Sequence, residues 1–268
     1  LFKDPNVYGP FLVPAMILAL QRMESMPALH GVLWLLLFGL LGLGLVLGFS
    51  RGSWLNFLVA ALCFLAYRLQ SERTPRAKRR LRAAVAGMFV IAVAVVAAAL
   101  TVPSVQEMME VRAKVTQDYD TESHVGGTKS RFDVQAETLQ LAMQRPLGIG
   151  AGQSEMNYNQ GKAPHNLLLH TLVEAGWLGG LAFYAFIALT LWVGGRLLFV
   201  PSAIQGEYQV AYACLVGLLV QSLFVDTTHW RHFYFLLALL WGPVQFLRIQ
   251  RRVTPLARAA HGQRLAFG

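Results

Sequence analysis

The chain is poor in charged residues, and acidic residues are the scarcer kind. Asp, Glu, Lys and Arg make up 14% of its 268 residues, against about a quarter in a typical soluble domain. Hydrophobic residues make up 55%, and the mean hydropathy is +0.47. This balance excludes a highly charged disordered chain and disfavours a soluble domain. The composition predicts an integral membrane protein.

Cysteine is rare as well, since the chain has only Cys63 and Cys214. Both fall within apolar stretches. We therefore expect packing residues, and not a disulfide or a metal-binding pair.

Long stretches without a charged residue follow one another along the chain. We expect a transmembrane helix in seven of them, because most approach the roughly 17 to 25 residues that span the hydrocarbon layer. The stretches are residues 11–21, 31–50, 53–67, 83–106, 175–195, 208–225 and 233–247. The predicted fold class is all-α, a polytopic membrane helix bundle with a long, partly helical external loop.

The basic residues indicate which side of the membrane each connection faces. The link Arg68–Arg82 and the tail from Arg248 are both densely basic. By the positive-inside rule both lie in the cytoplasm. Counting crossings from them also places the turns 22–30 and 196–207 inside. The external connections are then residues 1–10, 48–53, 103–174 and 226–232.

These expectations divide the chain into four parts. The first helices occupy residues 1–102, the external loop 103–164, the later helices 165–247 and the basic tail 248–268. The chain starts at Leu1 without a signal-peptide pattern, and we expect further helices to precede it in the full protein.

The formal net charge of +9 does not indicate nucleic acid binding. Most of the surplus lies in the cytoplasmic clusters beside membrane segments. The expected partner of these clusters is anionic lipid of the inner leaflet.

One segment of the external loop has helical periodicity. Phe132, Ala136, Leu139 and Met143 are spaced by four, three and four residues. This spacing predicts the apolar stripe of an amphipathic helix over residues 130–144. We expect the helix to lie along the membrane surface or to pack on the spans.

Arg131 stands in the first turn of that helix, beside Lys129. Ser130 and Asp133 resemble a capping box, although Asp is a shorter partner than Glu. Free backbone amides, the helix dipole and two cations make a candidate phosphate site. The alternative is a solvated arginine on an amphipathic helix.

Two further polar residues are expected on the same side as Arg131. Arg51 occupies a tight external turn between two spans, where the alternative is a snorkelling interfacial arginine. His165 opens the segment that leads directly into the span at residues 175–195. A neutral imidazole at this junction can take a proton from a sugar hydroxyl. The alternative is a helix-start histidine bonded to a carbonyl.

Two other motifs do not support a nucleotide or calcium site. The glycine-rich residues 148–152 follow a helical segment and Pro146, whereas a nucleotide loop follows a strand. We expect a flexible turn there that lets the loop fold back. The acidic residues Asp118, Asp120 and Glu122 lack the glycine and the bidentate Glu of a calcium loop.

A polar group also lies near residues 226–232. Its members are Asp226, His229, Arg231 and His232. We interpret it as a structural cap at an outer helix end, because no strong metal-ligand spacing is present.

Several segments together resemble the O-antigen ligase and polymerase superfamily, in their order and in their expected topology. The resemblance spans nearly the whole chain. Its most specific part is the long outer loop that closes on His165-Asn166. The segments are Phe2–Asn6, Ser50–Gly52, Ser130–Arg131, Arg145–Gly150, Pro164–Asn166 and Gly176–Gly179.

The resemblance implies a metal-independent, inverting glycosyltransferase without a cofactor, located in the bacterial inner membrane with its active site facing the periplasm. It would move a glycan from undecaprenyl diphosphate to an acceptor hydroxyl. Carried over residue by residue, Arg51 and Arg131 would bind the diphosphate, and His165 would be the general base.

Three other residues are expected in supporting roles. Lys129 would add charge near Arg131, and Asn166 would orient the loop or a sugar. Asp226 would pair with an arginine or steer His165. Glu174 lies about two and a half helical turns beyond His165 and is not expected to be its direct partner.

The acceptor stays open at this point. A lipid A core sugar, as in a ligase, is the first expectation. A growing O-antigen or exopolysaccharide and a protein hydroxyl are alternatives that use the same donor site. A transporter of lipid-linked glycans belongs to another class, but transporters usually carry ionisable groups near the midplane, where these spans have almost none. A purely structural membrane subunit is a further alternative.

Overall fold

All the regular secondary structure of the described residues is helical. The computed structural model describes residues 5–25, 27–71, 74–103, 107, 131–153 and 164–244. The helices are α1 (Pro5–Ser25), α2 (Ala28–Leu47), α3 (Arg51–Ser71), α4 (Pro75–Leu100), α6 (Arg131–Gln144), α7 (Leu167–Leu197), α8 (Gln205–Gln221) and a final run over residues 231–244. The predicted all-α class is confirmed.

Each of the seven predicted spans overlaps one of these helices. Among the described residues, three stretches are long and apolar enough to cross a membrane, namely His30–Leu47 in α2, all of α3 and all of α7. These three support an integral membrane protein. A total of seven crossings stays a prediction.

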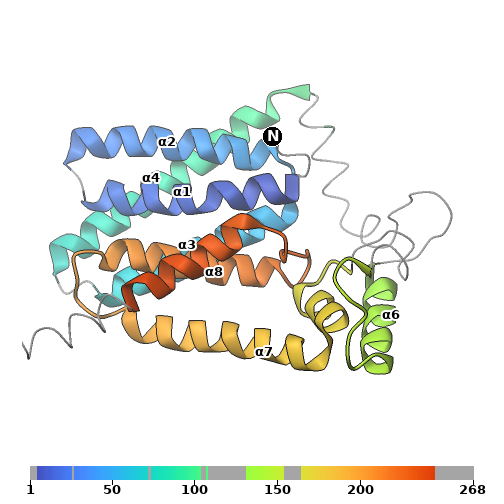
Figure 1. The fold of residues 1–268 in the computed structure, drawn as a ribbon. Helices are drawn as coiled ribbons and strands as arrows, with labels where there is room; N and C mark the ends of the chain where they lie inside the picture. Colours follow the sequence, from blue (N-terminus) through green and yellow to red (C-terminus); the bar gives the residue numbers. More distant parts are fainter. Residues whose placement is uncertain are drawn as a thin grey trace, which may run out of the picture.

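The middle of the bundle is the pair α3 and α8, which pack against each other most extensively (Figure 1). The Asn56 amide donates to Gln221 Oε1 at 2.9 Å across this pair. A Cβ at Gly217 would lie 2.6 Å from the Asn56 carbonyl oxygen, so only glycine permits this approach. α1 covers the pair, α2 packs on α1, and α4 crosses behind them. Small residues and paired amides are the usual means of joining membrane helices.

Polar contacts gather the expected cytoplasmic turns at one end of the bundle. Arg22 forms an ion pair with Glu207 at 2.9 Å. Gln209 donates to Ser71 Oγ at 2.7 Å and to the Leu198 carbonyl at 2.8 Å. The 22–30 turn, the start of the basic link and the 196–207 turn therefore lie together, as the predicted topology requires.

The expected external segments meet at the opposite end. Ser50 Oγ donates to Asn6 Oδ1 at 2.8 Å. The Leu167 amide donates to the Ser222 carbonyl at 2.9 Å. The start of α1, the turn before α3, the start of α7 and the end of α8 thus share one end. The contacts support the predicted grouping of these loops, while the side of the membrane on which each end lies stays a prediction.

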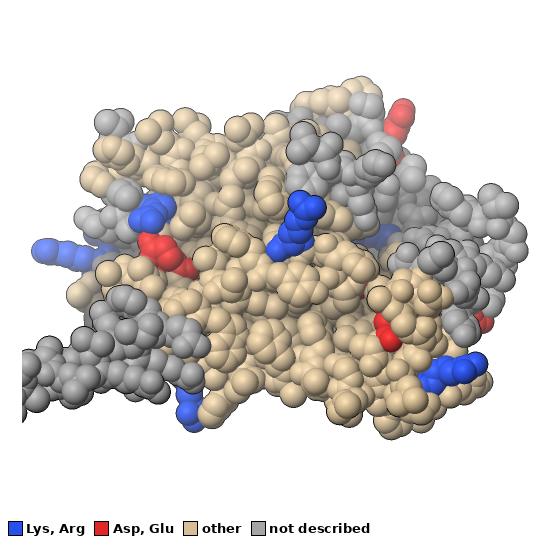
Figure 2. Space-filling model, viewed as in Figure 1, with Lys and Arg blue, Asp and Glu red and all other residues tan. Residues whose placement is uncertain are grey.

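The face of the molecule in Figure 2 is mostly uncharged between the two ends. Many large apolar side chains are exposed there, including Leu36, Leu40, Leu62, Leu181 and Phe235. Exposure on this scale is unfavourable in water and ordinary against lipid tails.

α6 (Arg131–Gln144) coincides with the helix predicted over residues 130–144, but the predicted apolar stripe is not the face that packs on α7. Of the predicted stripe, Ala136 is exposed, Leu139 is 48% exposed and Met143 is 61% exposed. The buried side chains are Val134, Thr138 and Ala142, four residues apart. Small side chains on this face permit a close approach to α7, and the Ala142 carbonyl accepts from Trp177 Nε1 at 2.9 Å.

Candidate functional site

α7 contains a break at Gly176. This residue has φ 73° and ψ −178°, outside the helical range, with helix on both sides. Residues 167–175 form a short leading segment, which we call the lead helix, and residues 177–197 form the long apolar part. The break falls at the start of the span predicted at residues 175–195.

The loop after α6 supplies the backbone contacts that the break removes. Ile149 N donates to the Val173 carbonyl at 3.0 Å, and Gly150 N donates to the Glu174 carbonyl at 3.1 Å. Trp177 N donates to the Pro146 carbonyl at 2.9 Å. A broken helix at the edge of a membrane needs such partners, because unsatisfied backbone groups are costly away from water.

Two glycines make this contact possible. Gly148 and Gly176 both have positive φ, where other residues are strained. A Cβ at Gly148 would lie 2.4 Å from the Glu174 carbonyl oxygen, and one at Gly176 would lie 2.5 Å from the Leu147 carbonyl carbon. The expected turn at residues 148–152 does fold back, but it is held by backbone hydrogen bonds and is not a free hinge.

Asn166 fixes the start of the lead helix. It is the N-cap, and its Oδ1 accepts from Leu168 N at 2.9 Å and Leu169 N at 3.1 Å. Its Nδ2 donates to the Leu223 carbonyl at 3.1 Å. The side chain therefore ties the start of the lead helix to the connection after α8, while its expected role toward the loop or a sugar stays a prediction.

His165 directly precedes this cap. Its φ is 48°, an uncommon value for a residue with a side chain, and it is half-buried. Strained backbone of this kind is often retained at functional positions. His165 lies just before the amino terminus of the lead helix.

Arg51 lies at the same end of the bundle. It is the first residue of α3, in the tight turn predicted between two spans, and it is half-buried. A Cβ on the neighbouring Gly52 would lie 3.1 Å from Gln221 Nε2. Gln221 is followed directly by the Ser222 and Leu223 carbonyls that hold the lead helix. The structure thus connects the Arg51 and His165 segments through residues 221–223.

Arg131 is the first residue of α6, as expected from its place in the predicted helix. Nothing is described of its side chain, and Lys129 lies outside the described residues. α6 packs beside the lead helix (Figure 1).

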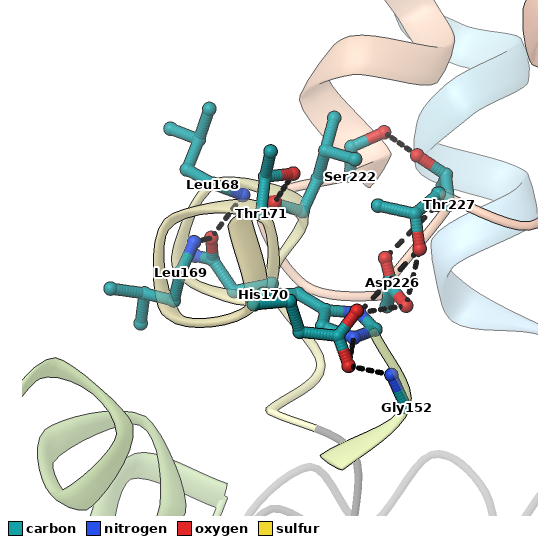
Figure 3. Close-up of polar contacts among 12 residues, drawn as sticks. Gly152, Leu168, Leu169, His170, Thr171, Ser222, Asp226 and Thr227 are labelled. Carbon is teal, nitrogen blue, oxygen red and sulfur yellow. Dashed lines mark hydrogen bonds and ion pairs between the residues drawn. The ribbon is translucent and has the colours of Figure 1, made fainter. Parts of the chain in front are cut away.

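The sequence analysis missed a buried ionisable side chain in this region, His170. This side chain of the lead helix is 1% exposed. Its Nδ1 contacts Asp226 Oδ2, and its Nε2 lies 3.0 Å from Glu174 Oε1 (Figure 3). A histidine and a glutamate four residues apart on one helix face were the available signal.

Within the described part of the chain, Asp226 contacts His170 and not an arginine, while its expected role in steering His165 stays a prediction. Its carboxylate contacts His170 and accepts from Thr228 N at 3.0 Å and Thr228 Oγ1 at 2.9 Å. Burial alone would raise the pKa of Asp226, but the bonds from His170 and Thr228 outweigh it and hold this pKa below its usual value.

The expected polar cap at residues 226–232 is divided in two. The His229 ring lies 5.8 Å from the His170 ring, edge to face, whereas His232 packs against Trp230 and Phe11. Ligand atoms of His170, Asp226 and His229 lie within 4.8 Å of one another, so this trio also has the residue types of a metal site.

Comparison with known proteins gives one clear result. The O-Antigen ligase family model matches residues 36–184, which include Arg51, Arg131 and His165. Comparison with curated proteins and with solved structures gave no match. Because the family match covers more than half of the chain, this protein belongs to the O-antigen ligase family, a family of membrane glycosyltransferases.

Proposed function

We propose that the chain transfers a glycan from undecaprenyl diphosphate to the hydroxyl of a lipid A core sugar, on the periplasmic face of a bacterial inner membrane. Family membership supports glycan transfer in general. The observation that carries the site is the junction at His165, a strained, half-buried histidine beside the Asn166 cap. The same end of the bundle holds Arg51.

The proposed chemistry is an inverting displacement. The acceptor oxygen attacks the anomeric carbon, the bond from that carbon to the diphosphate oxygen breaks, and the acceptor proton passes to His165. A neutral imidazole is required at the moment of attack, and a helix amino terminus favours that form. The proton then leaves His165 to solvent or to the departing diphosphate.

In this proposal Arg51 and Arg131 bind the diphosphate. Two guanidinium groups neutralise the charge that develops on the leaving group, a role that a metal ion fills in many soluble transferases. Lys129 adds to the same field. The proposal needs no metal ion and no cofactor.

Substitution of His165 tests the base. We expect His165→Ala to lower kcat by about 100- to 10,000-fold, with expression and membrane insertion unchanged. Release of undecaprenyl diphosphate by the reconstituted protein is the measurement. The matched control is His30→Ala, an exposed histidine of α2. Full activity of His165→Ala would exclude this residue as the base.

Substitution of the arginines tests the donor site. We expect Arg51→Lys to retain part of the activity, because lysine keeps the positive charge but not the two-pronged guanidinium. We expect Arg51→Gln to lose nearly all of it, because glutamine has neither. The same pair at Arg131 extends the test. The control is Arg76→Gln, an exposed arginine in α4. Unchanged donor affinity in all four variants would contradict the proposed diphosphate site.

The acceptor is tested by the surface glycan of a deletion strain. An uncapped lipid A core supports a ligase. Altered chain length indicates a polymerase, and unmodified protein indicates a protein glycosyltransferase. Movement of the donor lipid across the bilayer without bond cleavage would indicate a transporter.

A further inference from the structure

We propose that His170 is a positioning residue, a buried imidazolium that joins Asp226 to Glu174 and thereby fixes the helix start that carries His165. This inference deepens the proposed function and rests on it for its catalytic consequence. The contacts themselves do not depend on that function. We call the three side chains of Asp226, His170 and Glu174 the His170 clamp.

The two nitrogens of the ring both face carboxylate oxygens. Nδ1 contacts Asp226 Oδ2, and Nε2 lies 3.0 Å from Glu174 Oε1. A carboxylate only accepts hydrogen bonds, and a neutral imidazole has a single N–H. Both contacts are favourable only when both nitrogens carry protons. Carboxylate oxygens beside both ring nitrogens therefore favour the charged form of the ring.

The contact to Glu174 depends on that charge. It has the distance of an ion pair but not the direction of a straight hydrogen bond. His170 is 1% exposed, and a charge at such a site is tolerated only when it is paired. Around the ring, the titratable groups of the described residues are the two carboxylates and His229.

The clamp connects three separate segments of the chain. His170 and Glu174 belong to the lead helix. Glu174 Oε1 also accepts from Gly152 N at 2.7 Å, which holds the loop at residues 148–152. Asp226 belongs to the connection after α8 and is held in turn by Thr228. Figure 3 shows His170 beside Asp226, with Gly152 near the same ring.

His165 is five residues before His170, and the connection after α8 holds both ends of this interval. Asn166 and Leu167 bond to the Leu223 and Ser222 carbonyls. Asp226 holds the other end through His170. Loss of the clamp removes the side-chain attachment of the second end to this connection, so that only the bonds of Asn166 and Leu167 tie the interval to it. A shift of about 1 Å in a reacting group is enough to cost about 100-fold in rate.

A metal site is the competing use of the same ring. The trio with metal-ligand geometry is His170, Asp226 and His229, and it does not include Glu174. The clamp needs Glu174 and does not need His229, whose side chain is exposed. Glu174→Gln and His229→Gln therefore separate the two interpretations.

The first experiment measures the clamp without any activity. Backbone amide exchange is followed by mass spectrometry in the protein reconstituted in lipid. In His170→Gln and Glu174→Gln we expect peptides covering residues 148–153 to exchange about tenfold faster, which corresponds to about 1.4 kcal/mol of lost protection. Peptides of α8 serve as an internal reference, and His229→Gln serves as the matched control. Unchanged exchange at residues 148–153 in both clamp variants would overturn the proposal.

The second experiment observes the ring in the unmodified protein, so it does not depend on a variant folding. Nitrogen-15 spectra of histidine-labelled protein in bilayers are recorded at pH 8. We expect one histidine with both ring nitrogens protonated, and we expect that signal to shift in Glu174→Gln. A spectrum with neutral rings only would overturn the proposal. Bound zinc that is lost in His229→Gln would also overturn it, in favour of the metal site.

The third experiment links the clamp to transfer. We expect His170→Gln to lower kcat about 10- to 100-fold while KM for the lipid-linked donor changes less than about threefold. A lower kcat with little change in KM, together with faster amide exchange at residues 148–153, supports the positioning role. Unchanged kcat, with His165→Ala inactive, overturns the positioning role and leaves the proposed function standing. An active His165→Ala overturns the proposed function, while the first two experiments still decide the clamp.

Discussion

The two segments of α7 on either side of Gly176 are held in place by different forces. The lead helix, residues 167–175, is fixed by polar contacts to two loops, with His170, Glu174 and the Asn166 cap at their centre. The segment after the break packs through apolar and aromatic contacts, as where Phe186 stacks on Trp241. α7 thus combines a long apolar segment of membrane-spanning length with a short lead helix that makes polar contacts.

The difference teaches where chemistry is possible in such a chain. The segment after the break has few side chains that donate or accept hydrogen bonds or carry charge. The lead helix gathers them because the helix breaks at Gly176 and the lead helix meets the backbone of the loop at residues 146–150. His165 and His170, five residues apart, then have opposite environments, one half-buried at the loop and one enclosed between carboxylates.

Substitution of Gly176, the residue at the break, should have the largest effect on stability. In Gly176→Ala the new Cβ meets the backbone of residues 146–148 at a positive φ. We expect a loss of about 2 to 6 kcal/mol, from backbone strain and overpacking together. The thermal unfolding midpoint in detergent measures it.

Two other glycines separate the causes of that loss. At Gly152 the φ angle is positive, but an added Cβ would have nothing within 4 Å. We therefore expect Gly152→Ala to lower the free energy of unfolding by about 1 kcal/mol. Gly242→Ala lies in the final helical run, with nothing near its Cβ position, and should be neutral or slightly stabilising. Equal losses in all three variants would contradict the packing account.

Acid should next weaken the polar segment and spare the apolar one. The pKa of Asp226 lies below its usual value in the folded protein, where the bonds from His170 and Thr228 outweigh the opposing effect of burial. Its stabilising contribution is therefore complete above the unfolded pKa of about 3.9 and is lost as the pH falls through the folded pKa. Unfolding midpoints measured from pH 7 down to pH 3 should fall less steeply in Asp226→Asn than in the unmodified protein. Parallel curves would show that Asp226 does not stabilise the fold through its charge.

The attachment of α6 to α7 offers a smaller and more local test. Trp177→Phe keeps the ring packing but removes the Nε1 bond to the Ala142 carbonyl. We expect a loss of about 1 kcal/mol, visible as faster amide exchange in residues 131–144 with α3 unchanged. Equal amide exchange before and after the substitution would show that ring packing alone, without the Nε1 hydrogen bond, attaches α6 to α7.

The opposite end of the bundle should respond least. Arg22 and Glu207 form an ion pair there, but both side chains are about one third exposed. Solvent screens such pairs, so Glu207→Gln should change stability by less than about 1 kcal/mol. A loss of stability as large as that of Gly176→Ala would show that this end of the bundle is as sensitive to substitution as the Gly176 break.

The sequence by itself determined the helical membrane character, the position of the tight turn before Arg51, the helix after Ser130 and the family. These follow from local properties, namely apolar length, periodicity and short motifs, which need no knowledge of neighbours. It also gave the grouping of loops at the two ends, because charge bias and alternation of spans are properties of the linear chain.

Only the tertiary structure decided which faces and partners meet. The buried face of α6 is Val134, Thr138 and Ala142, because close approach to Trp177 matters more there than apolar character. The pairing of His170 with Asp226 joins residues 56 positions apart, and no local pattern encodes such a contact. The fit of residues 146–150 into the Gly176 break depends on two backbones meeting, and sequence periodicity carries no record of that.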